Sequence, residues 1–263
     1  MVPLFQIFDK TVSIYMILAV LGVLAALFVM YRLAIRDKLD EIEMLWLTIL
    51  CFLGSFLGGS LLYGLVNYRM ILALIRNWSQ VDSFGTFLDC FLSIFGGSVF
   101  YGGLLGILLV SWLYRKKRRL SRRYSDAVAI GVPVFHTFGR LGCFLGGCCY
   151  GVECKVGFVY HYSLAPNANG VRRFPVQLLE AAFNLCLLLI LYRLFRRKKL
   201  EGRLVNVYLY AYPAFRFLDE FLRGDTYRGL WWGLSTSQWV SLLLILGNTI
   251  YLLLSRRKKT DAV

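Results

Sequence analysis

Long apolar stretches that alternate with short polar ones dominate the sequence from end to end. Seven of the apolar stretches are about as long as a helix that crosses a bilayer, which takes roughly 20 residues. They cover approximately residues 12–34, 45–67, 87–114, 127–147, 177–195, 204–222 and 236–254. The pattern predicts an all-α integral membrane protein of about seven transmembrane helices, with residues 1–263 forming a single transmembrane domain.

The third stretch, residues 87–114, is longer than one span and is interrupted by polar and flexible residues. Asp89 lies near its start, and Gly96 and Gly97 lie in its middle. Non-helical backbone is tolerated at membrane depth where protein or water satisfies its polar groups. We interpret this stretch as either one long helix or a re-entrant element followed by a helix.

Lysine and arginine residues gather after the third, fifth and seventh spans. The basic runs fall in residues 115–123, 193–203 and 256–259. The positive-inside rule places all three runs in the cytoplasm, which agrees with seven spans because the odd-numbered loops and the tail then lie on one side. The N-terminus is expected outside and the C-terminus in the cytoplasm. The outer loops are residues 67–86, 148–176 and 223–235.

The composition supports a membrane protein and argues against a nucleic-acid partner. Hydrophobic residues make up 58% of the 263 residues, whereas a soluble domain has about 45–50%. The net charge of +15 is large, but the basic residues lie in short loops between apolar spans, where they act as orientation signals. We therefore expect contact with membrane lipid and none with nucleic acid. The sequence gives no signal for an oligomeric state.

The outer loop at residues 148–176 is too long for a simple connection between two helices. Residues 156–162 alternate between apolar and polar positions, which predicts a small β element. Long ordered loops often carry function. We therefore treat this loop as a subregion of the transmembrane domain.

An arginine lies near the outer end of the fourth span, in the glycine- and cysteine-rich segment 139–151. Arg140 is costly in hydrocarbon, and such residues often mark function. Arg216 lies in the sixth span and shares a helical face with Glu220. Two guanidinium groups at the outer surface suit a phosphate, and the most abundant phosphate in a membrane is a phospholipid head group. The alternative is structural pairing of the arginines with Glu220 or Glu180.

The seven cysteines fall into two groups. Three occur singly in apolar stretches and are expected to be small core residues: Cys51, Cys90 and Cys186. Four form the pattern C-x4-CC-x4-C at the outer face: Cys143, Cys148, Cys149 and Cys154. This spacing is not that of two C-x2-C pairs, so we expect no metal site. A disulfide, a reactive thiol and simple packing are the other interpretations of this group.

Several segments resemble those of a known family of membrane enzymes. Residues 139–151 (GRLGCFLGGCCYG) are similar to the signature of the bacterial prolipoprotein diacylglyceryl transferases. Residues 97–106 and 174–181 resemble the family's glycine-rich third segment and its His-Pro-Ser-Gln-Leu-Tyr-Glu-Ala motif. Residues 215–223 and 234–238 resemble its late Arg-x-x-x-Glu-Phe and Ser-x-Gln pattern. The segments occur in the family's order over nearly the whole chain.

The resemblance implies a reaction. The family moves the diacylglyceryl group of phosphatidylglycerol onto the cysteine thiol of a lipobox-containing lipoprotein precursor, and glycerol phosphate leaves. Arg140 and Arg216 would hold the lipid phosphate, and Glu220 would orient Arg216. Tyr15 and Tyr101 stand where the family has catalytic side chains. The reaction requires no metal and no cofactor, and the expected location is the bacterial cytoplasmic membrane, with the active site facing outside.

The resemblance also implies a set of residues that contact the substrates. They are Gly139, Gly142, Cys143, Gly147, Cys148, Gly151, Gln177 and Gln238. Gly147 and Gly151 would let the lipid head group approach the backbone closely.

The chain departs from the family pattern at four positions. Cys143 stands in place of asparagine and Cys148 in place of glutamate, while Tyr101 and Phe174 replace histidines. A tyrosine, with a pKa of about 10, is a poorer base at neutral pH than histidine. Two alternatives to the main hypothesis therefore stay open. One is a related phospholipid-dependent transferase with another acceptor, and the other is a non-enzymatic lipid-binding or thiol-redox membrane protein.

Overall fold

The computed structural model describes residues 4–7, 10–163, 165–225 and 230–260. The chain divides into two compact units. The first combines residues 1–37 with 122–263, and the second is formed by residues 38–121. Apart from short hairpins, the regular structure in the described residues is helical, as the all-α prediction requires.

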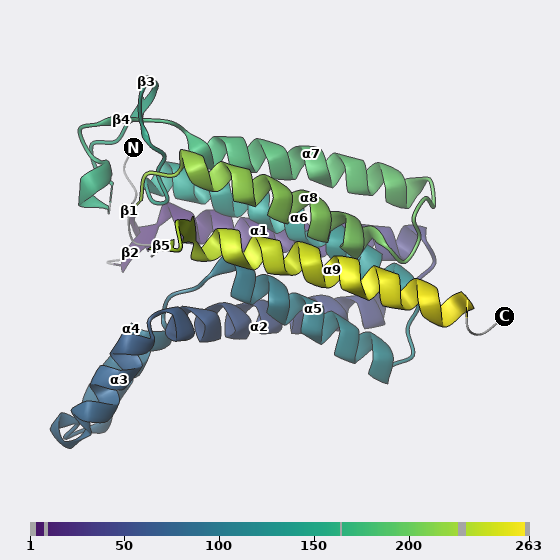
Figure 1. Cartoon of the computed structure of the whole chain (residues 1–263), viewed down its shortest axis with the longest axis horizontal. Helices are drawn as coiled ribbons and strands as arrows, with labels where there is room; N and C mark the ends of the chain where they lie inside the picture. Colours follow the sequence, from purple (N-terminus) through teal and green to yellow (C-terminus); the bar gives the residue numbers. More distant parts are fainter. Residues whose placement is uncertain (1–3, 8–9, 164, 226–229, 261–263) are drawn as a thin grey trace. The chain divides into compact units, whose positions relative to one another are not determined.

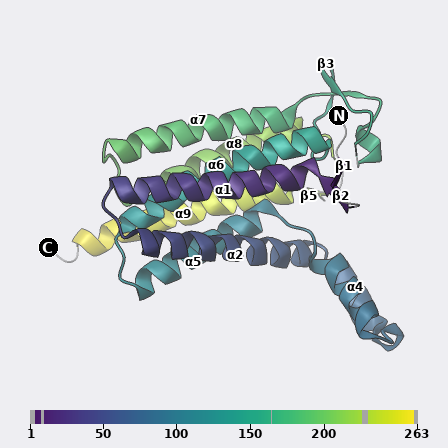
Figure 2. The ribbon, with the colours of Figure 1, turned by 180° about the vertical axis from the view of Figure 1, so that it is seen from behind.

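Five long helices of the described chain form the first unit. They are α1 (Ile14–Arg36), α6 (Arg122–Gly146), α7 (Val176–Arg196), α8 (Leu204–Asp219) and α9 (Thr236–Thr260). These helices run side by side (Figure 1 and Figure 2), and α6 packs against α1, α7 and α8. α6 is central, because 67% of the residues in its apolar 18-residue segment are buried, whereas 17% are buried in the corresponding segment of α1. Polar side chains on α6 are therefore enclosed by the neighbouring helices.

The start of α6 is fixed by buried polar contacts. Nη2 of Arg123 lies 2.5 Å from Oδ2 of Asp37, which follows α1. The same guanidinium stacks 3.6 Å from the ring centroid of Phe195 in α7. Asp126 accepts hydrogen bonds from the backbone N–H groups of Gly202 and Leu204, at 2.6 and 2.9 Å. These contacts tie the basic ends of α1, α7 and α8 to α6 and so set how the helices align.

Three two-stranded antiparallel sheets lie in the described part of the first unit, at the opposite end of the helices from the last turns of α9 (Figure 1). They are β1 (Leu4–Ile7) with β2 (Lys10–Ser13), β3 (Glu153–Val159) with β4 (Arg172–Arg173), and β5 (Leu230–Trp231) with β6 (Leu234–Ser235). The 3-10 helices of this unit are η2 (Pro166–Ala168) and η3 (Glu220–Leu222). β3 covers much of the alternating stretch for which the sequence predicts β structure.

The second unit is helical in its described residues. Its elements are α2 (Glu41–Val66), α3 (Tyr68–Arg76), η1 (Trp78–Gln80), α4 (Phe84–Phe95) and α5 (Phe100–Lys117). The axes of α4 and α5 differ by 90° at a break of four residues, and this break contains Gly96 and Gly97. The predicted interruption of the third apolar stretch is thus present as two separate helices.

Glycines bring α2 and α5 into close contact. A Cβ atom added to Gly106 would clash with the carbonyl oxygen of Gly54, and one added to Gly58 would clash with that of Gly102. Each helix therefore carries two glycines four residues apart, which is the small-xxx-small pattern of close helix pairs in membranes. Since the residue numbers rise along one helix as they fall along the other, the pair is antiparallel.

Replacing Gly106 with alanine should therefore destabilise the protein by about 1–3 kcal/mol, because the added methyl group overpacks the α2–α5 contact. The matched control is Gly247→Ala in α9, where a Cβ meets no atom within 4 Å. That variant should be as stable as the original or up to about 1 kcal/mol more stable, because alanine favours a helix. The free energies of unfolding in detergent micelles check both values, and equal values for the two variants would contradict the close contact.

Fewer of the described helices could span a membrane than the seven that the sequence pattern predicts. Five described helices are long and apolar enough to cross a bilayer: α1, α2, α6, α7 and residues 236–255 of α9. The bent pair of α4 and α5 brings the total to six if it counts as one span. The predicted span 204–222 corresponds to α8, which has 16 residues, followed by η3. A multi-pass membrane protein is confirmed, while the seventh span stays a prediction.

Candidate active site

A buried carboxylate on α7 collects three polar side chains from neighbouring helices. Oε2 of Glu180 lies 2.8 Å from Nε of Arg140 on α6. Its other oxygen lies 3.3 Å from Nε2 of His136 and accepts a hydrogen bond of 2.9 Å from the hydroxyl of Tyr212 on α8. All four side chains are buried, and Glu180 is only 1% exposed. A buried charge needs a partner, so this cluster fixes Arg140 in one place.

The second predicted arginine is held by two carboxylates at the end of α8. Nη1 of Arg216 lies 2.7 Å from Oδ2 of Asp219, and Nη2 lies 2.5 Å from Oε2 of Glu220. All three residues are buried. The pairing of Arg216 with Glu220 that the sequence predicts is therefore present, and Asp219 adds a second contact that the sequence reading did not include.

The structural pairing that the sequence left open is also present, because Arg140 contacts Glu180. This pairing does not prevent ligand binding. A guanidinium group has five N–H donors in a rigid planar fork, and Glu180 approaches that of Arg140 most closely at Nε. The arrangement holds the arginine while the rest of the fork can bind an anion such as a phosphate.

Of the two predicted catalytic tyrosines, Tyr15 packs on Gly142 near the end of α6. A Cβ atom added to Gly142 would lie 3.1 Å from Cδ2 of Tyr15 and 3.3 Å from its Cα. Gly142 thus lets the first turn of α1 pack directly on α6, two residues beyond Arg140. Tyr101 is buried on the first turn of α5, in the second unit, and its catalytic role stays a prediction.

The predicted glycines differ in what surrounds them. A Cβ on Gly139 would meet no atom within 4 Å, so space is open there. At Gly147 it would meet the side chain of Ser163 at 2.6 Å, and at Gly151 the carbonyl oxygen of Leu222 at 3.0 Å. The chain itself therefore requires glycine at positions 147 and 151, and contact of these two residues with lipid stays a prediction.

Residues 150–152 are joined by backbone hydrogen bonds to two other segments. The N–H of Val152 donates to the carbonyl of Leu222, and the N–H of Gly224 donates to the carbonyl of Tyr150, both at 2.9 Å. The N–H of Phe174 donates to the carbonyl of Val152 at 2.9 Å. The loop after α6 is thus attached to the segment that follows Arg216 and to the segment that precedes α7.

The two predicted glutamines have different positions. Nε2 of Gln177, on the first turn of α7, donates to the carbonyl of Cys148 at 2.7 Å and to the hydroxyl of Tyr160 at 3.3 Å. It therefore anchors the loop that contains the cysteines. Oε1 of Gln238 accepts from the N–H of Ser235 at 2.9 Å, and its Nε2 donates to the carbonyl of Phe217 at 3.3 Å. Gln238 thus ties the start of α9 to the end of α8.

The end of α6 brings two cysteines together through a Schellman motif. Gly147 has a φ of 73°, a left-handed conformation that glycine adopts without a steric penalty. The N–H of Cys148 donates to the carbonyl of Cys143 at 3.1 Å, and the N–H of Gly147 donates to that of Phe144 at 3.3 Å. These are the two bonds that define the motif, and they fold Cys148 back beside Cys143.

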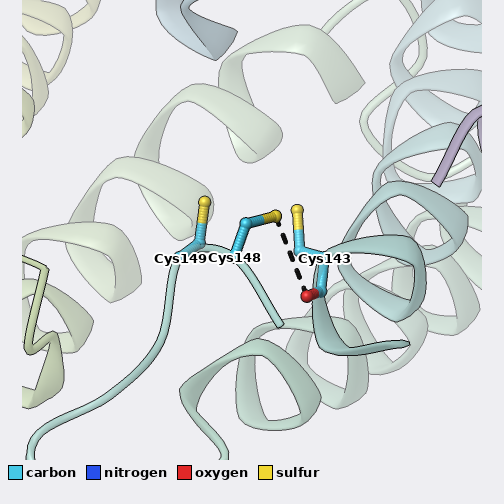
Figure 3. A group of neighbouring side chains, drawn as sticks. All are labelled: Cys143, Cys148 and Cys149. Carbon is cyan, nitrogen blue, oxygen red and sulfur yellow. Dashed lines mark hydrogen bonds between the residues drawn. The ribbon is translucent and has the colours of Figure 1, made fainter. Parts of the chain in front are cut away.

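A third cysteine joins the first two. Cys149 also has a left-handed backbone, with a φ of 55°. The sulfur atoms of Cys143, Cys148 and Cys149 all lie within 4.8 Å of one another, and Figure 3 shows them on the same side of the loop, with Cys148 extending toward Cys143. All three are free thiols. Cys154 lies outside this group, and its Sγ donates to the carbonyl of Val156 at 2.6 Å.

The thiols influence one another electrostatically. Hydrogen bonds from Cys143 and Cys148, together with the positive charges of Arg223 and Arg140, outweigh burial and hold the pKa of the Cys149 thiol well below its usual range. Among the three thiols, Cys149 is therefore the one that loses its proton most readily. A thiolate is the form that acts as a nucleophile or binds a metal.

Replacing Gly147 with alanine should cost about 1–2 kcal/mol, because a left-handed backbone is unfavourable for alanine and the methyl group would press on Ser163. The neighbouring Gly146→Ala variant is the matched control, because Gly146 has no positive φ and a Cβ there meets no atom within 4 Å. The rate of Cys148 alkylation should rise only in the Gly147 variant. Equal alkylation rates in the two variants would contradict a role for the Schellman motif in placing Cys148.

Sequence reasoning did not assign a site role to several residues of this region. They are Glu180, Tyr212, Asp219 and Cys149, together with His136 as a partner of Glu180. Glu180 gave a usable signal, because an acidic residue one turn inside an apolar span must face a polar partner. Tyr212 gave none, since a tyrosine in such a span is usually unremarkable.

Comparison with known proteins identifies relatives over almost the whole chain. The family model described as prolipoprotein diacylglyceryl transferase matches residues 3–254. A phosphatidylglycerol–prolipoprotein diacylglyceryl transferase of Clostridium tetani is 31% identical over 245 residues, which cover 92% of this chain and 93% of the relative. Proteins of the same name from Campylobacter hominis and Geobacter sulfurreducens are 33% and 34% identical. Their alignments cover 98% and 93% of this chain, and 92% and 91% of the relatives.

Proposed function

Because the chain belongs to the prolipoprotein diacylglyceryl transferase family, we propose that it transfers the diacylglyceryl group of phosphatidylglycerol to the cysteine thiol of a lipoprotein precursor. Family membership confirms the resemblance in the sequence and makes the protein a membrane transferase. The observation that carries the assignment of the site is a pair of buried arginines, Arg140 and Arg216, each held by carboxylates.

In this proposal Arg140 and Arg216 bind the phosphate of phosphatidylglycerol. Glu180 holds the first arginine, and Asp219 and Glu220 hold the second. Donors that are already fixed do not have to reorganise when charge develops on a leaving group, which is the usual source of electrostatic catalysis. Burial strengthens the effect, because water that would screen the charges is excluded.

The acceptor thiolate attacks the glyceryl carbon that carries the phosphate ester. A carbon–sulfur bond forms, the carbon–oxygen bond breaks, and glycerol phosphate leaves with the bonding electrons. The arginines stabilise the negative charge that grows on this leaving group. Tyr15, packed on Gly142, contacts the reacting groups from α1, and the open space at Gly139 accommodates part of the head group.

We further propose that the site faces the outside of a bacterial cytoplasmic membrane. The basic residues that follow α5 and α7 support this orientation by the positive-inside rule. α8, with η3, then serves as a short seventh span, and the loop at residues 148–176 lies outside. The sheets lie at the opposite end of the first unit from the last turns of α9 (Figure 1), which is consistent with an outer loop and a cytoplasmic end of α9.

Two experiments test the proposed function. The first is complementation of a bacterial strain depleted of its own transferase, with insertion of the protein checked by an epitope tag. The second uses purified protein in phosphatidylglycerol vesicles with a lipobox peptide, and mass spectrometry measures the gain of a diacylglyceryl group. A peptide with serine in place of the acceptor cysteine is the control and should stay unmodified. Absence of transfer by properly folded protein would overturn the proposal.

A further inference from the structure

The family resemblance implies substrate contacts for Cys143 and Cys148, but the steps of the proposed transfer give none of the three clustered cysteines a chemical task. Cys143 lies on α6 three residues after Arg140, so both side chains project from the same side of the helix. Cys148 and Cys149 follow directly after the helix and turn back toward it. The thiols therefore lie about one helical turn beyond the arginine that binds the lipid phosphate in the proposed function.

The backbone is shaped to bring these thiols together. Two of the three residues 147–149, Gly147 and Cys149, have a positive φ. Such a backbone is unfavourable for a residue other than glycine, yet Cys149 adopts it. The amide of Gln177 fixes the loop by binding the carbonyl of Cys148. A group of three sulfur atoms within 4.8 Å of one another results.

We propose that Cys143, Cys148 and Cys149 bind a zinc ion, and that the acceptor thiol of the lipoprotein precursor is its fourth ligand. Thiolates are the ligands that zinc and other soft cations prefer. In a tetrahedral site with zinc–sulfur bonds of about 2.3 Å, the sulfur atoms lie about 3.8 Å apart. To bind the ion, each pair of sulfur atoms would therefore have to approach by roughly 1 Å at most.

Three protein ligands and an open fourth position are typical of catalytic zinc sites, whereas structural sites have four protein ligands. Cys154 is the nearest further cysteine in the sequence, but its thiol binds the carbonyl of Val156 and it is not part of the group. A disulfide would use only two of the three thiols and would leave the third without a partner in the group. The described residues therefore fit an ion that keeps one position free for a substrate.

The zinc ion supplies what the transfer reaction needs at the acceptor. A thiol that coordinates zinc loses its proton, which is released to water. The zinc-bound thiolate then forms the carbon–sulfur bond, and glycerol phosphate departs with the electrons of the broken carbon–oxygen bond. The balance is one thiol and one phosphatidylglycerol giving one thioether, one glycerol phosphate and one proton, with no change in oxidation state.

Activation of the acceptor rests on the proposed function, whereas binding of the metal does not. The two parts therefore need separate measurements. The first measures metal in the full-length protein, purified in detergent under reducing conditions and freed of loosely bound ions. Zinc should be present at about one ion per chain. Cys143→Ser and Cys149→Ser should each lower the zinc content at least tenfold, and Cys154→Ser, the matched control, should leave it unchanged.

A loss of zinc in the serine variants could arise from misfolding, so a second measurement uses the unaltered protein. Cobalt(II) added to the reduced, zinc-free protein should give the visible absorption bands of a tetrahedral thiolate site. A lipobox peptide with its cysteine should shift these bands, and the same peptide with serine should not. Absence of zinc and of cobalt bands, or a disulfide between two of the three cysteines in the active protein, would overturn the proposal.

The transfer assay separates failure of this inference from failure of the proposed function. Full transfer activity in protein depleted of zinc would overturn the role of the metal and keep the transferase. One bound zinc per chain and a cobalt spectrum that responds to the cysteine peptide, without any transfer from phosphatidylglycerol, would support the metal site and overturn the proposed reaction.

Discussion

Replacing Arg140 with lysine should lower kcat/KM for diacylglyceryl transfer by about 10²–10³-fold, the usual cost of removing one donor that stabilises developing charge. Lysine keeps the positive charge but lacks the planar fork that binds two phosphate oxygens at once. It can still pair with Glu180, which lies 2.8 Å from the arginine. The fold should therefore persist while the two-point contact of the guanidinium with the phosphate is lost.

The control for this variant is the same change at Arg172, which is exposed on β4 and donates to the carbonyl of Lys155. Arg172→Lys should keep its activity within about twofold, because exposed polar contacts contribute little. Both variants should keep the thermal midpoint of the original protein to within a few degrees. Unchanged turnover in a folded Arg140→Lys protein would mean that the arginine is structural and does not bind the lipid phosphate.

Replacing Glu180 with alanine should destabilise the protein by about 3–5 kcal/mol, because it leaves a buried charge without its partner. Arg140 would lose its ion pair, and the hydroxyl of Tyr212 would lose its acceptor. The free energy of unfolding in detergent micelles measures the effect. The matched control is Glu153→Ala. Glu153 is exposed, lies 3.7 Å from Arg173, and should cost at most about 1 kcal/mol.

A second variant shows whether the loss comes from the uncompensated charge. Replacing a buried ion pair by apolar residues of similar size is often neutral or stabilising. The double variant Arg140→Met with Glu180→Leu should therefore recover most of the stability lost in Glu180→Ala, while transfer activity stays absent. If the double variant is less stable than the single one, the packing of α6 on α7, rather than the charge pair, determines stability.

Contacts between residues of one helix were easier to predict from the sequence than contacts between two helices. Arg216 and Glu220 are four residues apart, so helical geometry alone places them together, and the structure has them paired. The pair of Arg140 with Glu180 depends on which faces of α6 and α7 meet. Hydrophobic periodicity is weak in helices surrounded by lipid and protein, so the sequence could only offer this pair as an alternative.

The cysteine group illustrates a different limit. The spacing C-x4-CC did not match the paired spacing of common zinc sites, because that pattern assumes a simple hairpin between ligands. In the structure a Schellman motif at Gly147 shortens the path from Cys143 to Cys148. A glycine directly after an apolar helix predicts such a motif, and the motif sets the first and the sixth of its residues side by side. The motif at the helix end, and not the cysteine spacing, therefore predicts that Cys143 and Cys148 lie together.

The backbone hydrogen bonds of residues 150–152 bear on the order in which the two substrates bind. They connect the loop that carries Cys148 and Cys149 to residues 222–224, which follow the arginine of α8. In the proposed function Arg216 takes up a phosphate, and these hydrogen bonds would pass any shift of Arg216 to the loop. A loop that holds the acceptor, as in the zinc proposal, would then change its affinity for it. Linkage is reciprocal, so the acceptor must alter the affinity for phosphatidylglycerol by the same factor. The two substrates would then bind cooperatively.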